Sequence, residues 1–509
     1  MEDTRLADLR RRLAEVADLE KAASLLSWDQ QTMMPRAGAA ARAEQLATLR
    51  RVAHERLASA ELGLLLDALV DREQSLPPDS DEASLIRVAR ADHEKARRVP
   101  AELRAEMTRA GSLARNVWLE ARARADFGLL LPHLELNVEL CRRYADCFEH
   151  QGSPYDALLD IYEAGRTGAE VQAVFDRLKA ELRPLIATVL EHSEAVEHDF
   201  LHGYFPPEGQ RGAAMSLLEL LGFDPASWRL DPTAHPFAMS GAPTDIRITT
   251  RFDSSHLTES LFMAMHEFGH GLYEHQVSPA LWRSPLGRGA SLGLHESQSR
   301  LWENLVGRSR GLWRMLLPRL RAAFPQQLAH VELEDFYRAV NRVELSPIRA
   351  RADEATYNLH VILRFELERE LFDGSLAVRD LPEAWNASME NYLGVTVPDA
   401  SQGVLQDVHW AAGLFGYFPT YALGNVMSAQ IWERALEQIP TLGDRLTPED
   451  IAALRDWLGE RLHRHGRKLT PRETLERAVG SDLDPGPYLA YLRSKFGEIY
   501  GLQLEPAAV

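Results

Sequence analysis

Apolar residues recur every three or four positions along most of this chain, and this helical periodicity restricts the fold more than any other feature of the sequence. Helix starts are also marked: Thr447-Pro448 and Thr470-Pro471 place a capping threonine before a proline, and Glu473 completes a capping box. We predict helices over residues 4–27, 39–73, 80–128, 132–151, 168–199, 257–276, 290–324, 333–343, 353–373, 427–438, 448–465 and 471–480. The expected fold class is therefore mainly α.

Proline-rich breaks interrupt this pattern at residues 76–78, 205–209 and 484–487, but none is long enough to be a flexible linker between domains. No fixed-period repeat or low-complexity tract is visible. We therefore predict one large domain over residues 1–509. Its helical N-terminal portion would cover about residues 1–200, and its catalytic core would cover about residues 230–430.

One segment instead has the alternating pattern of a β-strand. In residues 245–252, Ile246 and Ile248 alternate with polar neighbours, and Ile and Thr favour strands. We expect this segment to be an edge strand of a small β-sheet near the active site. An edge that faces a cleft can pair with an extended peptide.

The composition excludes some classes of protein. Lys and Arg total 57 against 75 Asp and Glu, and the net charge of −18 argues against a nucleic-acid binder or a polybasic membrane binder. The two cysteines, Cys141 and Cys147, are too few for a disulfide framework, so we expect free thiols. Residues 1–26 are charged throughout and lack the apolar stretch of a secretory signal, so we expect a cytoplasmic protein.

Residues 408–432 contain no Asp, Glu, Lys or Arg and match a membrane span in length. However, the segment also contains polar and helix-breaking residues that no lipid-facing helix would collect, namely His409, Gly413, Gly416, Pro419, Gly424, Asn425, Ser428 and Gln430. We therefore expect no membrane span here but a buried segment whose polar groups line a site.

Residues 266–270 form an HExxH motif within a helical pattern. Residues i and i+4 share one helix face, so His266 and His270 can bind one ion through imidazole nitrogen atoms, which zinc accepts. Glu267 lies about 100° around the helix from His266. It is therefore free to act as the general base that takes a proton from a metal-bound water.

Glu296 is the candidate third ligand. It follows His270 at a distance that allows residues 277–286 to turn and a second helix to return past the first. The resulting His₂Glu site would keep one open position, as catalytic zinc sites do. The alternatives are His295 and Glu303. A helix turns about 100° per residue, so His295 and Glu296 cannot both face the ion, and Glu303 could instead support a ligand histidine.

Taken together, these motifs resemble those of the carboxypeptidase Taq family of metallocarboxypeptidases. In chain order they are His235-Pro236-Phe237, Asp245-Ile246-Arg247-Ile248-Thr249, His266-Glu267-Phe268-Gly269-His270, His295-Glu296-Ser297-Gln298, Ile348-Arg349-Ala350-Arg351-Ala352-Asp353 and Gly403-Val404-Leu405-Gln406-Asp407-Val408-His409-Trp410. Ser27-Trp28-Asp29-Gln30 and Met33-Met34-Pro35 are also similar to the family. The resemblance covers nearly the whole chain, and ordered motifs are more specific than any single one.

The resemblance implies a mostly α-helical fold with a deep substrate groove, similar to neurolysin-type oligopeptidases, and a homodimer. It implies a metal-dependent carboxypeptidase with one Zn²⁺ or Co²⁺ per subunit. Such an enzyme releases single residues with broad specificity from peptides that have a free C-terminus. An endo-acting metallo-oligopeptidase with the same chemistry is the alternative.

A carboxypeptidase must recognise the free α-carboxylate of its substrate, and arginine binds a carboxylate bidentately. Arg349 lies in a motif that resembles the family, directly before the helix predicted to begin at residue 353. Arg247, on the predicted edge strand, is the rival candidate.

The reaction also needs hydrogen-bond donors for the developing oxyanion. A tyrosine 12 residues after a histidine resembles the arrangement of neurolysin-type enzymes, which favours His409 with Tyr421. Tyr417 is the alternative to Tyr421.

Overall fold

The computed structural model describes residues 4–148, 152–443 and 446–505. Its residues group into two compact units, each built from segments that are distant in the sequence. The expected catalytic core, about residues 230–430, contributes residues to both units. The first unit comprises Met1–Arg97, His198–Val340 and Ile431–Asp482, and the second comprises Arg98–Glu197, Asn341–Gln430 and Leu483–Val509.

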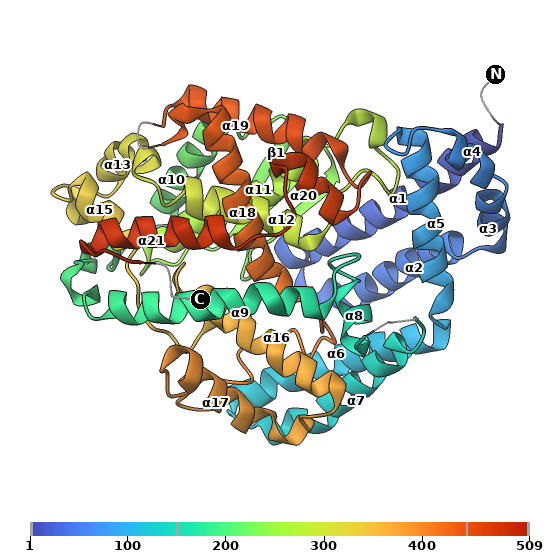
Figure 1. Cartoon of the computed structure of the whole chain (residues 1–509), viewed down its shortest axis with the longest axis horizontal. Helices are drawn as coiled ribbons and strands as arrows, with labels where there is room; N and C mark the ends of the chain where they lie inside the picture. The colour runs from blue at the N-terminus through green and yellow to red at the C-terminus, as the bar shows by residue number, and fades with distance from the viewer. Residues whose placement is uncertain (1–3, 149–151, 444–445, 506–509) are drawn as a thin grey trace. The chain divides into compact units, whose positions relative to one another are not determined.

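Both units are mainly helical, as predicted (Figure 1). The first unit contains α1 (Thr4–Thr32), α2 (Ala39–Leu57), α3 (Ala60–Asp67), α4 (Val70–Ser75), α5 (Asp81–Arg98), α10 (Pro207–Leu221), α11 (Leu257–His275), α12 (Leu292–Arg300), α13 (Arg310–Ala323), α14 (Pro325–Leu328), α15 (Leu333–Val340), α19 (Pro448–Arg461) and α20 (Pro471–Val479). The second contains α6 (Ala101–Ala123), α7 (Phe127–Ala145), α8 (Pro154–Leu159), α9 (Gly168–Leu190), α16 (Tyr357–Asp373), α17 (Leu381–Leu393) and α21 (Gly486–Tyr500). Helix α18 (Pro419–Gln438) begins in the second unit and ends in the first.

Three of the predicted helices are divided in the structure. Residues 39–73 form α2, α3 and α4, residues 80–128 form α5 and α6, and residues 290–324 form α12, a π-helical segment (Leu301–Val306) and α13. The break between α5 and α6 falls at Pro100, since proline lacks an N–H and disfavours a helix interior. The apolar periodicity predicts these helical regions correctly. It continues through short breaks between helices, however, so it does not show where one helix ends and the next begins.

Several predicted helix ends were also wrong. The helix predicted over 353–373 begins only at Tyr357, because the Asp353 carboxylate accepts hydrogen bonds from the N–H groups of Ala355 and Thr356 and holds a turn there. The helix predicted over 168–199 ends at Leu190. The helix predicted over 132–151 spans Phe127–Ala145, and residues 149–151 lie outside the described residues.

Five helices of the described residues escaped prediction, and each has a proline in its first turn: α8, α10, α14, α17 and α21. The first N–H groups of a helix have no partner within the helix, so proline is well tolerated there. The prolines at residues 205–209 and 484–487 predict breaks, whereas the structure begins a helix within each segment.

A three-stranded sheet in the first unit has the order β1 (Trp228–Pro232), β3 (Asp245–Thr250), β2 (Ala238–Ala242). Strand β3 pairs in parallel with β1 and antiparallel with β2. The predicted strand therefore exists, but the prediction that it lies at an edge is wrong. The alternating pattern of β3 predicts a strand but does not show which strands lie beside it. Pro232 in β1 and Gly241 in β2 weaken the strand signal of those two segments.

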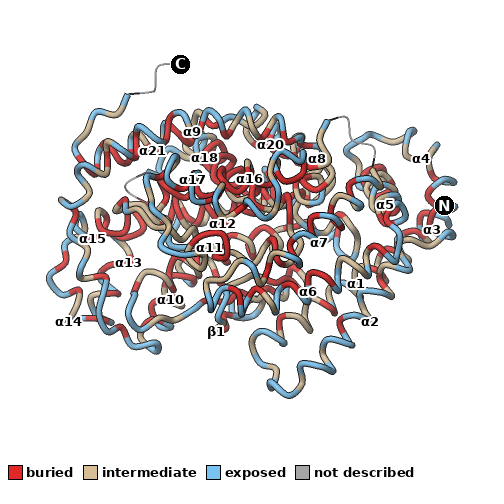
Figure 2. Tube along the Cα trace, turned by 90° about the horizontal axis from the view of Figure 1, so that it is seen from below, coloured by how far each residue is buried: buried red, intermediate tan, exposed pale blue. Residues whose placement is uncertain are grey.

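The helix that contains the HExxH motif, α11, packs between this sheet and α12. Two glycines allow the close approach. A Cβ atom at Gly269 would lie 2.5 Å from the carbonyl oxygen of Gln298 on α12. A Cβ atom at Gly271 would lie 2.5 Å from the Trp228 ring on β1. Buried residues consequently recur along α11 (Figure 2).

The uncharged stretch over residues 408–432 is buried for most of its length, as predicted. Two of its polar side chains donate hydrogen bonds: Asn425 donates to the side-chain oxygen of Asn358 at 2.8 Å, and Ser428 donates to the backbone carbonyl of Asn425. Within the described residues, no helix is long and apolar enough to cross a membrane.

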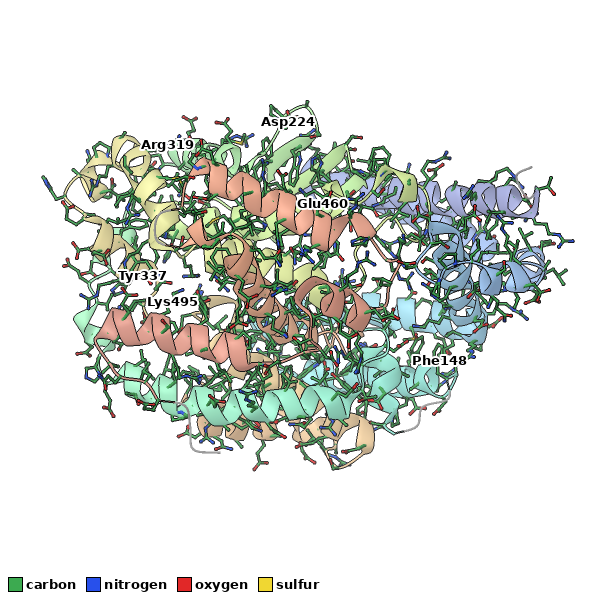
Figure 3. All side chains as sticks on the ribbon, turned by 45° about the horizontal axis from the view of Figure 1, so that its top comes forward. Phe148, Asp224, Arg319, Tyr337, Glu460 and Lys495 are labelled. Atoms are coloured by element: carbon green, nitrogen blue, oxygen red, sulfur yellow. The ribbon has the colours of Figure 1, made fainter. Side chains whose placement is uncertain are left out.

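A buried ion pair anchors the C-terminal helix of the second unit. Lys495 on α21 (Figure 3) places its Nζ 2.5 Å from Oε2 of Glu354, and both side chains are at most 5% exposed. Tyr488 on the same helix donates to the backbone carbonyl of Glu354. These contacts hold the turn that follows Arg349.

We expect Lys495→Met to lower the free energy of unfolding by about 3–5 kcal/mol, because it leaves the Glu354 carboxylate buried without its cation. Denaturant unfolding of the whole chain measures this loss. Arg51→Met is the control: Arg51 pairs with Glu55 at 2.8 Å, but both side chains are more than half exposed, so the expected change is below about 1 kcal/mol. Equal losses in the two variants would contradict the role of the buried pair.

Candidate active site

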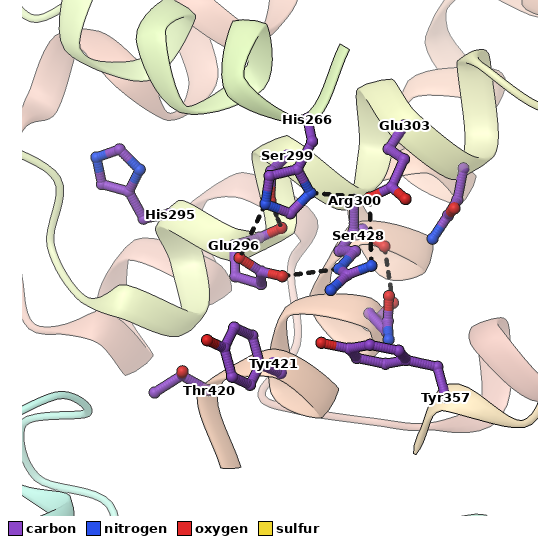
Figure 4. Close-up of polar contacts among 12 residues, drawn as sticks. His266, His295, Glu296, Ser299, Arg300, Glu303, Tyr357, Thr420, Tyr421 and Ser428 are labelled. Atoms are coloured by element: carbon purple, nitrogen blue, oxygen red, sulfur yellow. Dashed lines mark hydrogen bonds and ion pairs between the residues drawn. The ribbon is translucent and has the colours of Figure 1, made fainter. Parts of the chain in front are cut away.

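His266 and His270 lie one turn apart on α11, and their ring centroids are 4.9 Å apart. Glu296 on α12 completes a compact group with them, and Figure 4 shows it beside His266. Its Oε2 lies 3.7 Å from Nε2 of His266 and 3.5 Å from Nε2 of His270. Three atoms that could bind a metal ion, two imidazole nitrogens and one carboxylate oxygen, therefore lie close together.

These distances fit a divalent transition metal. Tetrahedral bonds of about 2.0–2.1 Å place neighbouring ligand atoms roughly 3.3–3.4 Å apart, close to the separations of Glu296 from the two histidines. Among the residues that the structure describes, these three form the one group with such an arrangement. Two imidazoles and one carboxylate are also a known ligand set of catalytic zinc.

The Glu303 carboxylate contacts the ring nitrogen of His266 that does not face Glu296. Nδ1 of His266 lies 2.8 Å from Oε2 of Glu303, which belongs to the π-helical segment after α12. Arg300 joins the two glutamates: its Nε donates to Glu296 at 2.7 Å and its Nη1 donates to Glu303 at 3.2 Å (Figure 4). Glu303 thus has the position of a partner for a ligand histidine, one of the two roles considered for it from the sequence.

His270 is supported differently. Its Nδ1 lies 2.8 Å from Nδ1 of His295, and Nε2 of His295 lies 3.0 Å from Oε1 of Glu274. His295 therefore lies behind His270, while its neighbour Glu296 faces the group of ligand atoms, as a turn of about 100° between adjacent helix residues requires.

The electrostatics of this cluster favour a cation. Burial opposes charge on both imidazoles, but the carboxylates of Glu296 and Glu303 outweigh it at His266 and raise its pKa to about 9. Burial dominates at His270 and lowers its pKa to about 4. The negative potential that holds a proton on His266 would equally attract a metal ion in its place.

Glu267 lies beside His266 on α11 and is only 6% exposed. Burial raises its pKa to about 7, since the charged carboxylate is poorly solvated there. A helix turns about 100° per residue, so the Glu267 side chain leaves α11 in a different direction from the two histidines. It therefore remains available for proton transfer.

Arg247 lies on β3 in the first unit and already has a carboxylate partner. Its Nε and Nη2 donate to Asp245 at 2.8 and 3.1 Å, and its guanidinium lies 4.4 Å from the centre of the Trp28 ring. Arg229 lies 4.8 Å from the same ring and pairs with Asp231. Each arginine here is matched by one aspartate.

Arg349 belongs to the second unit and lies in a cluster with an excess of positive charge. Its Nη2 donates to Oδ1 of Asp407 at 2.7 Å, and Arg364 pairs with Oδ2 of the same carboxylate at 2.7 Å. Burial opposes the charge of Asp407, but Arg349 and Arg364 hold its pKa well below the ordinary value. Two buried guanidiniums thus share one carboxylate.

The candidate oxyanion donors lie in this same cluster. Nε2 of His409 lies 3.1 Å from the hydroxyl of Tyr421, whose ring lies 4.9 Å from the Arg349 guanidinium. The Tyr417 ring is 5.4 Å from that of His409. Burial lowers the pKa of His409 to about 4, so its ring is neutral near pH 7. The structure therefore brings Arg349, His409, Tyr417 and Tyr421 together within the second unit.

Sequence reasoning assigned no role to several residues of these clusters: Glu274, Arg300, Arg364 and Asp407. Arg364 could have been found from the sequence, because it is a single charge inside the apolar run of residues 361–365, and the structure buries it fully. Asp407 lies within a recognised motif, but its pairing with Arg364 joins residues that are 43 positions apart.

Comparison with known proteins agrees with this site. The family model described as carboxypeptidase Taq (M32) metallopeptidase matches residues 8–496. Thermostable carboxypeptidase 1 of Thermus thermophilus is 42% identical over 496 residues, which cover 96% of this chain and 97% of the relative. Carboxypeptidase 1 of Bacillus subtilis is 36% identical over 96% of this chain and 97% of the relative.

Solved structures show the same relationship. The crystal structure of the M32 carboxypeptidase from Deinococcus radiodurans R1 matches with a TM-score of 0.94 and 43% identity, over 98% of this chain and 100% of that chain. This chain belongs to the carboxypeptidase Taq (M32) metallopeptidase family and is a metallocarboxypeptidase.

Proposed function

We propose that this metallocarboxypeptidase releases single residues, with broad side-chain tolerance, from the free C-termini of peptides. His266, His270 and Glu296 would hold one Zn²⁺ or Co²⁺, and Glu267 would transfer the proton. The observation that carries this proposal is the convergence of the three ligand atoms beside Glu267. A divalent cation bound there would polarise the scissile carbonyl and make a nearby water molecule more acidic.

Glu267 would act first as general base and then as general acid. One of its carboxylate oxygens accepts a proton from the attacking water, and the same group later donates it to the nitrogen of the leaving amine. A buried glutamate suits this task because its pKa lies closer to neutral pH than the pKa of an exposed glutamate.

Arg349 is the better candidate for binding the substrate carboxylate. Its cluster contains two guanidiniums for one aspartate, so an added carboxylate would balance the remaining positive charge. The Nε and Nη2 atoms of Arg349 face Asp407, and its Nη1 donates to Tyr357. Arg247, by contrast, is already neutralised by Asp245.

His409 and Tyr421 would donate hydrogen bonds to the oxyanion that develops during attack, with Tyr417 as the alternative to Tyr421. Their mutual contact and the neutral state of His409 near pH 7 support this role. The proposed metal ligands and the proposed base belong to the first unit. The proposed donors for the carboxylate and the oxyanion belong to the second.

Other parts of the proposal rest on the family resemblance. A single domain over residues 1–509 and a deep substrate groove of the neurolysin type remain predictions. A homodimer and a cytoplasmic location remain predictions. The free state of Cys141 and Cys147 agrees with a reducing compartment.

Mass spectrometry of peptide products tests the function directly. With zinc- or cobalt-loaded protein, an unblocked peptide should lose residues one at a time from its C-terminus, and its amidated counterpart should stay intact. Removal of the metal with a chelator should abolish the reaction without unfolding the chain, because a core of this size does not depend on one ion. Internal cleavage of the amidated peptide would favour the endo-acting alternative, and full activity without metal would end the proposal.

Substitution of the two glutamates should separate base from ligand. Glu267→Gln keeps the shape of the side chain but cannot accept the proton, so turnover should fall by at least about 10²-fold while bound metal is retained. Glu296→Gln should instead weaken metal binding. Metal content by mass spectrometry and turnover of an unblocked peptide measure the two effects, and opposite behaviour of the variants would reverse the assignment.

Arg349→Ala should lower kcat/KM for an unblocked peptide by about 10- to 150-fold. The reason is that a hydrogen bond to a charged group contributes roughly 1.5–3 kcal/mol. Arg349→Lys should recover only part of this loss, since lysine offers a point charge without the planar fork. The measurement is kcat/KM for peptides of the same sequence with free and amidated C-termini.

Arg247→Ala is the matched control in that assay, because Arg247 also pairs with an aspartate and contacts an aromatic ring. We expect it to affect the free and the amidated peptide alike. If Arg247→Ala alone lowers kcat/KM for the free peptide and not for the amidated one, Arg247 on β3 recognises the substrate carboxylate.

A further inference from the structure

Two imidazoles of the first unit face each other through the same type of nitrogen. Nδ1 of His270 and Nδ1 of His295 are 2.8 Å apart, which is a hydrogen-bond distance and requires that one nitrogen carries a hydrogen and the other does not. The other ring nitrogen of His295, Nε2, lies 3.0 Å from the Glu274 carboxylate. The order of these contacts determines where the hydrogens must be.

The Glu274 carboxylate, the last group in this series of contacts, can only accept a hydrogen bond. Nε2 of His295 must therefore carry a hydrogen and donate it to Glu274. With one hydrogen on the His295 ring, at Nε2, its Nδ1 has a lone pair and accepts. Nδ1 of His270 then carries the hydrogen of this contact and donates it to His295. This leaves the lone pair of His270 on Nε2, the atom that faces Glu296.

We propose that His295, oriented by Glu274, is the positioning residue that keeps His270 in the tautomer whose Nε2 can bind a metal ion. This inference rests on the proposed metal site and assigns His295 a role behind the ligand instead of among the ligands. His266 receives the corresponding support from Glu303 directly.

The surroundings of His295 restrict its ring to this orientation. Its ring centroid lies 5.1 Å from that of Tyr273, at an interplanar angle of 35°. A Cβ atom at Gly289 would lie 2.7 Å from Cδ2 of His295, so the backbone approaches the ring closely on that side.

Glu274 is equally restricted. It accepts a hydrogen bond from the N–H of Gly289 at 3.1 Å and lies 3.6 Å from Nζ of Lys21 on α1. Two hydrogen bonds and one ion pair thus hold the carboxylate in place. A reversed His295 ring would turn a nitrogen without hydrogen toward it.

The test is the zinc dissociation constant of the full-length, metal-stripped protein, measured by competition with a chromophoric chelator. Asn and Gln at position 295 form a matched pair, because the amide of Asn reaches the place of Nδ1 and that of Gln reaches the place of Nε2. His295→Asn can accept from His270 and should keep most of the affinity. His295→Gln and His295→Phe cannot, and each should weaken zinc binding by about 10- to 100-fold.

His275→Phe is the control for the loss of an imidazole, and His275 lies on α11, the helix of His270. Nδ1 of His275 contacts the backbone carbonyl of Pro243 and not the metal site, so zinc affinity should be unchanged. The visible absorption of the Co²⁺-loaded protein gives a second readout. It should be similar in His295→Asn and the unmodified chain, and altered in His295→Gln.

Affinity unchanged in His295→Gln, or lowered equally in His295→Asn and His295→Gln, would overturn the inference. A purely structural role predicts one of these two results. The metal site itself is judged separately: if the unmodified chain binds no zinc, or if Glu296→Gln binds it as tightly, the proposed function fails whatever the substitutions at position 295 show.

Discussion

The backbone of α11 lies against that of α12 at Gly269, and the geometry of the candidate metal site depends on this contact. A side chain at Gly269 would meet the carbonyl oxygen of Gln298, which is two residues beyond Glu296. On the opposite side, Gly271 admits the Trp228 ring of the sheet. The HExxH helix is therefore held between two rigid neighbours, and Glu296 reaches both histidines without a change in either helix.

Charge is distributed unequally between the two clusters. In the first unit, Glu296 and Glu303 share the one guanidinium of Arg300, and Glu267 lies nearby. In the second, Arg349 and Arg364 share the one carboxylate of Asp407. Burial makes such imbalances costly unless an ion of opposite charge binds. A metal cation suits the first cluster, and the terminal carboxylate of a peptide suits the second.

The sequence predicted what depends on local spacing and failed where distant segments meet. Two histidines four residues apart must share a helix face, so the candidate ligand pair follows from the motif alone. The middle position of β3 depends on β1 and β2, which carry weak strand signals of their own. The role of Asp407 depends on Arg364, which lies on a different element. Prolines misled the prediction because a helix start and a helix break look alike in sequence.

The unequal support of the two histidines follows from the register of α12 against α11. Residues 296, 300 and 303 lie on nearly the same face of α12 and its π-helical continuation, which brings a carboxylate to His266. His295 lies about 100° around the helix from Glu296 and points instead toward His270. There an imidazole spans the gap to Glu274, which is one turn beyond His270 on α11. A shift of α12 by one residue would exchange Glu296, the proposed ligand, with its neighbour and undo both arrangements. The contact at Gly269 therefore determines the proposed ligands and their supporting residues together.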